Sequence, residues 1–201
     1  LACGLGQAMA YRPEEYAALL DQAQAAAQRG LELDACDSEC LRILAQIAML
    51  RGNLELAVRH QERGLFLNPN DDRSVCAMGE FLSFMGRSEE AEDWIRKAMR
   101  LNPYHPPRYC SHLARVLVHL GRHEEALDAL KSIRVPRVRE RAYPAAASYA
   151  LDDPRLIEGS VASLRGVKRD FDPELFVRKL PYDANEDRQA LLDALNGALG
   201  S

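Results

Sequence analysis

Residues 72–105 read DRSVCAMGEFLSFMGRSEEAEDWIRKAMRLNPYH, and they contain the pattern that decides the fold. The tripeptide Leu101-Asn102-Pro103 near their end repeats Leu67-Asn68-Pro69 at a distance of 34 residues, and Gly52 and Gly86 are separated by the same interval. Self-similarity at a fixed period of roughly 20 to 50 residues is typical of proteins built from stacked repeats. The sequence therefore predicts an array of short repeated units.

Each unit is expected to contain two helices. In the first half of residues 72–105 the apolar positions fall at i, i+3, i+4 and i+7, as Val75, Met78, Gly79 and Leu82. This spacing places them on one face of a helix. Ala91, Ile95 and Ala98 mark one face of a second helix, for which Ser88 is the expected N-cap residue. The sequence therefore predicts a helix–turn–helix unit with its break at Gly86.

This period, with two helices in each unit, resembles the tetratricopeptide repeat, whose pattern is W-x2-L-G-x2-Y, then A-x3-F, then P. Aliphatic residues replace the aromatic ones here, and the matching positions of residues 72–105 are Val75, Met78, Gly79, Leu82, Ala91, Ile95 and Pro103. The units that begin near residues 38 and 107 follow the same phase. The resemblance implies an all-α fold: a right-handed α-solenoid of helix–turn–helix repeats with a C-terminal capping helix.

The same phase divides the chain into six segments. They are a partial N-terminal repeat with a long helix over 13–33 (1–37), three repeats (38–71, 72–106 and 107–137), a degenerate repeat (138–171) and C-terminal capping helices (172–201). Asp153-Pro154 and Asp172-Pro173 are expected to open helices, because aspartate is a good N-cap residue and proline fits the first helical position. An apolar stripe on the predicted last helix, 185–199, is expected to cover the face of the last repeat.

Two short stretches resemble a particular bacterial group of repeat regions, those found C-terminal to class III adenylate/guanylate cyclase domains or to winged-helix DNA-binding domains. They are Leu101-Asn102-Pro103-Tyr104-His105-Pro106 and the tail Leu180-Pro181-Tyr182, followed by Asp187-Arg188-x2-Leu191-Leu192-x2-Leu195. The tail departs from the group in having Asp183-Ala184-Asn185 where a Lys-Asp-Pro-like run is common. This resemblance implies the regulatory region of a bacterial signalling protein, whose effector domain lies outside this chain.

The composition restricts the classes of function. Of 201 residues, 47% are hydrophobic, and the formal net charge is −4. A charge this small argues against nucleic-acid or anionic-membrane binding, and no apolar stretch approaches the roughly 20 residues of a membrane span. Five cysteines at irregular spacing indicate free thiols rather than a disulfide framework. Since no signal peptide is visible after Leu1, we expect a cytoplasmic protein.

The sequence contains no motif of a self-contained enzyme, and we expect neither catalysis nor a cofactor. Gly4-Leu5-Gly6 lacks the third glycine of a dinucleotide-binding loop, and there is no G-x-S-x-G or H-E-x-x-H pattern. Cys36 and Cys40 are interpreted as two separate packed thiols, because a structural zinc site needs four ligands. The basic run 131–141 is interpreted as a solvated turn between helices, with phosphate or acidic-peptide binding as the alternative.

Tetratricopeptide repeats commonly bind peptides or a partner's helix along a concave groove, which the first helix of each unit lines. By this resemblance the groove contains Arg42, Gln46, Met49, Arg73, Cys76, Glu80, Ser83, Arg108, Ser111, His112, Arg115, His119, Arg141 and Ser148. For the histidines a plain solvated surface is the alternative. Arginine pairs with carboxylates in a bidentate manner, so we expect a protein or peptide partner with acidic residues or a free C-terminus. Formation of a homodimer through the terminal helices, which carry Leu19 and Leu20, is a second hypothesis.

Overall fold

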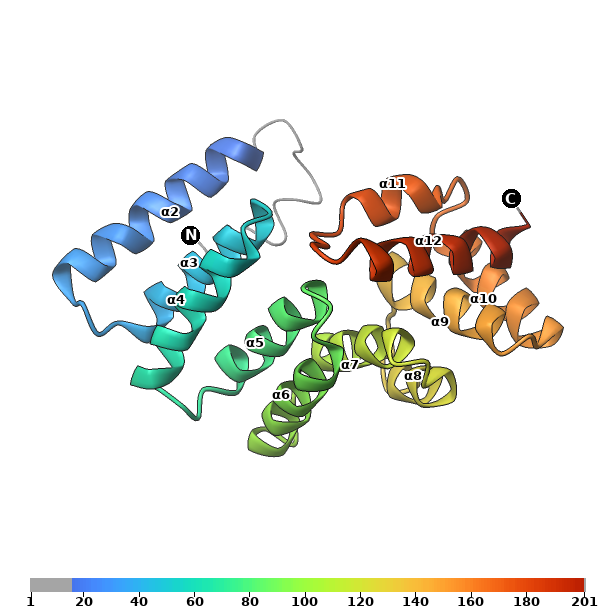
Figure 1. The fold of residues 1–201 in the computed structure, drawn as a ribbon, viewed down its shortest axis with the longest axis horizontal. Helices are drawn as coiled ribbons and strands as arrows, with labels where there is room; N and C mark the ends of the chain where they lie inside the picture. Colours follow the sequence, from blue (N-terminus) through green and yellow to red (C-terminus); the bar gives the residue numbers. More distant parts are fainter. Residues whose placement is uncertain (1–15, 201) are drawn as a thin grey trace.

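The computed structural model describes residues 16–200, and within that range it contains eleven α-helices and no β-strand (Figure 1). They are α2 (Tyr16–Leu33), α3 (Ser38–Leu50), α4 (Leu54–Leu67), α5 (Asp72–Phe84), α6 (Ser88–Leu101), α7 (Pro107–His119), α8 (His123–Leu130), α9 (Val138–Ala150), α10 (Pro154–Val167), α11 (Pro173–Arg178) and α12 (Asn185–Leu199). The predicted all-α fold class is confirmed. Of the predicted long helix over 13–33, residues 13–15 lie outside the described range.

A residue with positive φ lies in the turn between the two helices of each of the four pairs α3/α4, α5/α6, α7/α8 and α9/α10. These residues are Gly52, Gly86 and Gly121, with φ of 76°, 78° and 71°, and Asp152, with φ of 52°. In the three glycine turns, the N–H of the next residue donates to a carbonyl oxygen five residues earlier, at 2.8–3.0 Å. Glycine adopts positive φ without the steric cost of a Cβ, so the 34-residue spacing of Gly52 and Gly86 follows from a backbone requirement.

Side-chain caps fix the starts of five helices. The capping residues, each of which accepts a hydrogen bond from a backbone N–H of the first turn, are Asp37, Asn53, Asp71, Asp153 and Asp172. The helix starts predicted at Asp153-Pro154 and Asp172-Pro173 are confirmed. The prediction that Ser88 is an N-cap residue is wrong: Ser88 is the first residue of α6, and Arg87 occupies the cap position without a side-chain cap hydrogen bond.

Small residues let the two helices of the second full unit approach closely. Ala91, Ile95 and Ala98 are completely buried, which confirms the predicted inner face of α6. A Cβ at Gly79 would lie 2.6 Å from Ile95 Cγ1 and 2.8 Å from the carbonyl oxygen of Ala91. Carbon atoms in contact prefer a separation of about 3.5–4.0 Å. The helices α5 and α6 therefore pack this closely because residue 79 has no side chain.

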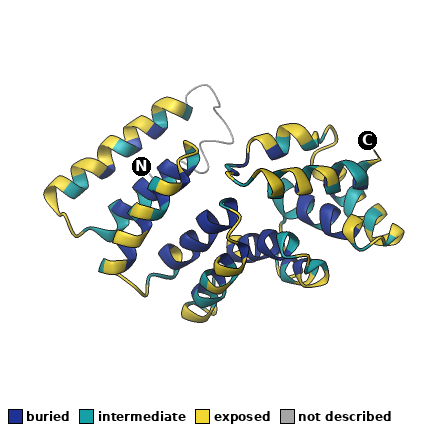
Figure 2. Cartoon of the chain, viewed as in Figure 1, coloured by how far each residue is buried: buried dark blue, intermediate teal, exposed yellow. Residues whose placement is uncertain are grey.

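The array curves so that the first helices of the pairs lie on its inner side. The helix α5 contacts α3 and α7, and α7 in turn contacts α9. On the outer side a crevice separates the second helices α4 and α6. Figure 2 shows α5 and α7 largely in the colour of buried residues, and every residue from Ser74 to Phe84 is buried. The inner helices therefore form the centre of the molecule.

Candidate functional site on the inner face

The C-terminal part of the chain lies against the inner face of α5, α7 and α9. The helix α12 packs on α9, and the connection between α11 and α12 reaches back to the end of α5. Figure 1 shows α11 and α12 on the side of α5 and α7 that faces away from α6 and α8. We refer to residues 180–187, which make this contact, as the docked segment. They cover part of the surface that the sequence assigned to the groove.

Tyr182 is the centre of this contact and is only 3% exposed. Its ring packs edge-on against the rings of Phe84 in α5 and His119 in α7, with centroids 5.0 and 5.4 Å away. Arg115 of α7 and Tyr143 of α9 also face it. Burial and the neighbouring Tyr143 raise the pKa of Tyr182 well above its ordinary value, so the hydroxyl stays protonated. We refer to Phe84, Arg115, His119 and Tyr143 as the tyrosine pocket.

His119 gives the tyrosine pocket a polar end. Its Nε2 lies 2.7 Å from the Tyr182 hydroxyl oxygen, and its Nδ1 lies 3.8 Å from Asp187 Oδ1. Burial, reinforced by the charge of Arg115, lowers the pKa of His119 to about 3, so the ring is neutral at pH 7. The proximity of Asp187 favours a proton on Nδ1, and the Tyr182 hydroxyl then donates to Nε2. The tyrosine pocket therefore accepts a hydrogen bond from a tyrosine hydroxyl and also packs against the aromatic ring.

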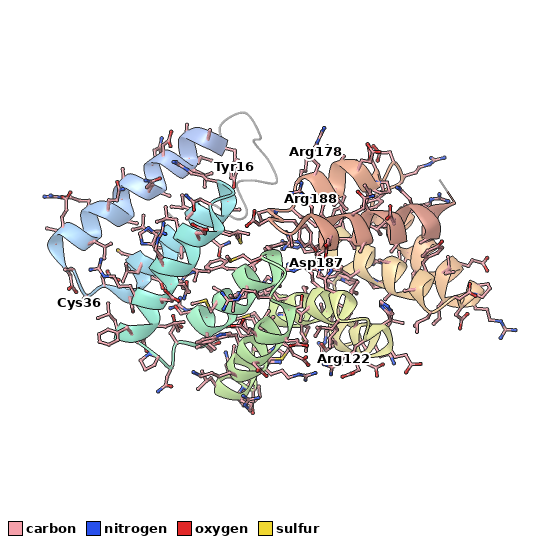
Figure 3. The ribbon with its side chains drawn as sticks, viewed as in Figure 1. Tyr16, Cys36, Arg122, Arg178, Asp187 and Arg188 are labelled. Atoms are coloured by element: carbon pink, nitrogen blue, oxygen red, sulfur yellow. The ribbon has the colours of Figure 1, made fainter. Side chains whose placement is uncertain are left out.

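The backbone of the docked segment is also held. The N–H groups of Asp183 and Ala184 donate to the carbonyl oxygen of Phe84, at 3.0 and 3.4 Å. Phe84 is the last residue of α5, and the last carbonyl groups of a helix lack partners within it. The guanidinium of Arg188 donates to the carbonyl oxygen of Tyr182, and Figure 3 shows Asp187 and Arg188 at this junction. The docked segment is thus held through two backbone N–H groups and one anchoring side chain. It turns tightly at Pro181, where the Tyr182 N–H donates to the Leu180 carbonyl oxygen at 2.9 Å, and its last residues, 185–187, form the first turn of α12.

A completely buried arginine lies under the docked segment. The Nε and Nη2 atoms of Arg115 donate to the hydroxyl oxygen of Ser83, at 3.1 and 2.7 Å. Its guanidinium carbon lies 3.9 Å from the centre of the Phe84 ring, a cation–π contact. Its Nη1 has no hydrogen-bond partner in the described part of the chain. Arg115 is therefore a buried cation that neutral groups surround on several sides.

Glu80 and His112 extend this buried polar layer. His112 Nδ1 lies 3.5 Å from Glu80 Oε1, and neither side chain is more than 10% exposed. Burial lowers the pKa of His112 to about 4, so the ring is neutral at pH 7. Burial acts to raise the pKa of Glu80, but the positive charges of His112, which is protonated only at acid pH, and of Arg115 outweigh it and hold this pKa below its ordinary value. The layer therefore contains a buried carboxylate close to a buried guanidinium.

The structure separates the predicted groove residues into three sets. The first set, whose side chains are exposed or half-buried, comprises Arg42, Gln46, Arg73 and Arg108. Buried are Met49, Cys76, Glu80, Ser83, Ser111, His112, Arg115 and the side chain of His119. Arg141 and Ser148 bond instead to Ser163 and Ser160 of α10. Of these residues, Glu80, Ser83, His112, Arg115 and His119 are brought together on α5 and α7, next to the docked segment.

The exposed arginines lie on α3 and at the starts of α5 and α7. Arg42 donates to both carboxylate oxygens of Glu39, at 2.9 and 2.5 Å, and Arg73 donates to Glu39 at 3.1 Å. Arg108 lies over the ring of Tyr109, with its guanidinium carbon 5.2 Å from the ring centre. These cations therefore lie near the starts of the inner helices, whereas the docked segment contacts the ends of α5 and α7.

Sequence reasoning missed the aromatic residues of the site, Phe84, Tyr143 and Tyr182. Phe84 and Tyr143 fall outside the residues that the repeat phase assigns to the groove. Tyr182 belongs to the Leu180-Pro181-Tyr182 stretch, which sequence comparison marked as distinctive without indicating where it packs. That stretch was therefore the sequence signal from which Tyr182 could have been found.

A second hollow lies on the outer face, between α4 and α6. It has a volume of about 380 Å³, and its lining includes the apolar side chains of Leu65, Phe66 and Trp94. Phe66 is 87% exposed, and the Lys97 ammonium lies 5.1 Å from the centre of the Trp94 ring. Trp94 therefore borders this crevice, between neighbouring units.

The described residues 16–200 include no group of three or more His, Cys, Asp or Glu side chains that could hold a metal ion. None of the described helices combines the length and the apolar character that a membrane crossing requires. Cys36, Cys40, Cys76 and Cys110 are unpaired, which confirms free thiols at these four positions.

Comparison with known proteins identifies the repeat. Residues 72–105 and 107–131 match two family models described as tetratricopeptide repeat. No curated protein sequence gives a significant match. Similar solved structures include YrrB, described as a TPR protein with an unusual peptide-binding site (19% identity, 87% of this chain and 91% of that chain covered, TM-score 0.59). Others are MamA (17% identity, 86% and 97% covered, TM-score 0.60) and Pseudomonas aeruginosa pilF (15% identity, 83% and 76% covered, TM-score 0.62). The chain therefore has the solenoid fold of tetratricopeptide repeat proteins.

Proposed function

We propose that this tetratricopeptide repeat solenoid binds an extended peptide segment of a partner protein on the inner face of its first helices. One observation carries the proposal: the inner face already holds a short piece of its own chain through backbone hydrogen bonds and a buried tyrosine. Two backbone N–H groups of the docked segment bond to Phe84, and Tyr182 is buried among three inner helices. A surface that presents this helix-end carbonyl group beside an aromatic pocket can hold a segment of another protein in the same way.

The arginines at the starts of α5 and α7, at the other end of these helices from the docked segment, favour an acidic partner. Arg73 is 47% exposed, and its ion pairs with Glu39 and Asp71 lie at the surface. Surface ion pairs contribute only about 0–1 kcal/mol, so a carboxylate of the partner can replace them at little cost. Arg108 is exposed beside them. A partner with Asp and Glu residues or a free C-terminal carboxylate is therefore the complementary ligand.

Charge reversal on the inner face tests this proposal. The ligand is a fluorescent peptide rich in Asp and Glu with a free C-terminus, and fluorescence anisotropy measures its affinity. The variant Arg73→Glu/Arg108→Glu should bind at least about ten-fold more weakly than the wild type, a loss of about 1.4 kcal/mol. The control Arg59→Glu/Arg155→Glu changes the same net charge at exposed positions of α4 and α10 and should bind like the wild type. An equal loss in both variants, or no loss in the first, would contradict the proposal.

A second candidate function is the regulatory region of a bacterial nucleotide cyclase or transcription regulator. One observation favours it: the Leu180-Pro181-Tyr182 stretch, which carries the resemblance to such regions, is the stretch that docks on the inner face. The native gene product tests this candidate. An effector domain encoded before Leu1 would support it, and a product no longer than these 201 residues would contradict it.

A further inference from the structure

Buried polar atoms are left without partners where the docked segment meets the inner face. Four such atoms in the described residues are Arg115 Nη1, the Tyr143 hydroxyl oxygen, Asp187 Oδ2 and Arg188 Nε. Arg115 faces Tyr182, Asp187 lies beside His119, and Arg188 holds the carbonyl group of Tyr182. Each buried polar group that lacks a hydrogen bond costs about 1–3 kcal/mol. The docked segment is therefore attached less firmly than its burial alone indicates.

The surface under the docked segment mixes polar and apolar groups, whereas the contact made by the rest of α12 is apolar. Next to Tyr182 lie Arg115 and His119, and Arg115 bonds in turn to Ser83. The body of α12 instead buries Leu191 and Leu195 almost completely. Arginine is almost never fully buried unless it is paired. The two parts of the C-terminal region thus differ in chemistry: the fully buried residues of α12 are apolar, whereas the docked segment buries Leu180 and Tyr182 beside charged and polar groups.

We propose that the docked segment is an internal ligand, and that a partner segment bearing a tyrosine displaces it from the tyrosine pocket. This inference rests on the proposed function, because it names the anchoring side chain and the competitor at the same inner face. Phe84 and His119 receive the ring edge-on, and His119 Nε2 receives the hydroxyl. A phenylalanine would leave that nitrogen unpaired. Since Leu180 and Pro181 precede the tyrosine here, and the Tyr182 N–H donates to the Leu180 carbonyl oxygen, the matching partner sequence is an apolar residue, a proline and a tyrosine in a tight turn.

Competition from within the chain sets the expected affinities. A tethered segment acts at an effective concentration of about the millimolar range, so a free peptide binds only the small fraction of molecules in which the pocket is open. Removal of the Tyr182 side chain takes away the anchor of the internal ligand and leaves the pocket residues in place. A free peptide should then bind at least about ten-fold more tightly than it binds the wild type.

The test uses a labelled peptide with the sequence of residues 178–190, RKLPYDANEDRQA, and the full chain. Anisotropy titrations compare the wild type, Tyr182→Ala and the control Tyr104→Ala, which removes a tyrosine that is 96% exposed. We expect the at least ten-fold gain for Tyr182→Ala only, and no binding of a peptide in which alanine replaces the tyrosine. Equal affinity for the wild type and Tyr182→Ala, or equal binding of the alanine peptide, would overturn the proposal.

Hydrogen exchange of the wild-type chain gives a readout that needs no variant. The amides of Asp183 and Ala184 should exchange at least ten-fold faster than those of Leu113–Leu117 in α7, because the docked segment opens while the units stay folded. Equal protection of the two sets would overturn the proposal.

The acidic peptide separates the two proposals. If it binds the wild type and responds to charge reversal while the tail peptide gains nothing in Tyr182→Ala, the internal ligand is refuted and the proposed function stands. If the tail peptide gains affinity and the acidic peptide binds neither protein, the preference for acidic partners is refuted and the tyrosine pocket stands.

Discussion

Replacement of Gly79 by alanine tests the close approach of α5 and α6 at the centre of the array. The new Cβ would lie 2.6 Å from Ile95 Cγ1 and 2.8 Å from the carbonyl oxygen of Ala91, which is backbone and cannot move alone. Overpacking costs about 1–3 kcal/mol, and alanine gains about 1 kcal/mol over glycine in a helix. Because backbone is part of the obstacle, the steric cost takes the upper part of its range. We expect a net loss of about 1–2 kcal/mol in the free energy of unfolding.

Gly159→Ala is the matched control for this prediction. It makes the same change inside α10, where no atom lies within 4 Å of the new Cβ. The control should therefore raise the free energy of unfolding by about 0.5–1 kcal/mol. Urea denaturation followed by circular dichroism compares both variants with the wild type at constant m-value. A Gly79→Ala protein as stable as the wild type, or stabilised like the control, would refute the argument from close approach.

Three further predictions concern the buried groups of the inner face. Ser83→Ala removes the oxygen that accepts two hydrogen bonds from Arg115. It should lower the free energy of unfolding by about 1–3 kcal/mol in the same urea assay. An unchanged midpoint of urea denaturation would contradict this account of Arg115. Burial lowers the pKa of His119 from its ordinary 6.5 to about 3, so its contribution is complete above pH 6.5 and is lost as the pH falls toward 3. Thermal melts between pH 7 and pH 5 should show a smaller loss of stability in His119→Gln than in the wild type, and parallel profiles would contradict the prediction. Burial raises the pKa of the Cys76 thiol, whereas Cys36 is exposed. A thiol reagent should therefore modify Cys36 in the native protein and leave Cys76 intact until the chain unfolds. Peptide mass spectrometry measures the modification of both cysteines, and early modification of Cys76 would contradict its burial.

The sequence was sufficient to predict the features that depend on local chemistry. Gly52 and Gly86 repeat because a turn needs positive φ, and Gly79 and Ala91 are small because two helices touch there. These requirements recur in each unit, so a 34-residue comparison finds them. Asp152 takes the same positive-φ position without being glycine, which explains why the fourth unit looks degenerate in sequence.

The place of the docked segment could not be predicted in this way. Its contacts join Tyr182 to Phe84 and His119, which are far away in the sequence and belong to different units. Periodicity assigns Ser83, Arg115 and His119 to the inner side, but it contains no information on what covers them. The physical reason is that a solenoid pattern encodes contacts between neighbouring units, and the return of the C-terminal region is a contact of another kind.

The bonds from Asp183 and Ala184 to Phe84 change how the array as a whole responds to stress. In an open solenoid each unit touches only its neighbours, so unfolding proceeds unit by unit from an end. Here these bonds close a large loop of the chain that contains the third and fourth units. The chain loses the conformational entropy of closing this loop a single time, for all the enclosed units together. While the docked segment is in place, the enclosed units are linked and should unfold together rather than one at a time. A partner that displaces the docked segment would open this loop and let the enclosed units unfold independently.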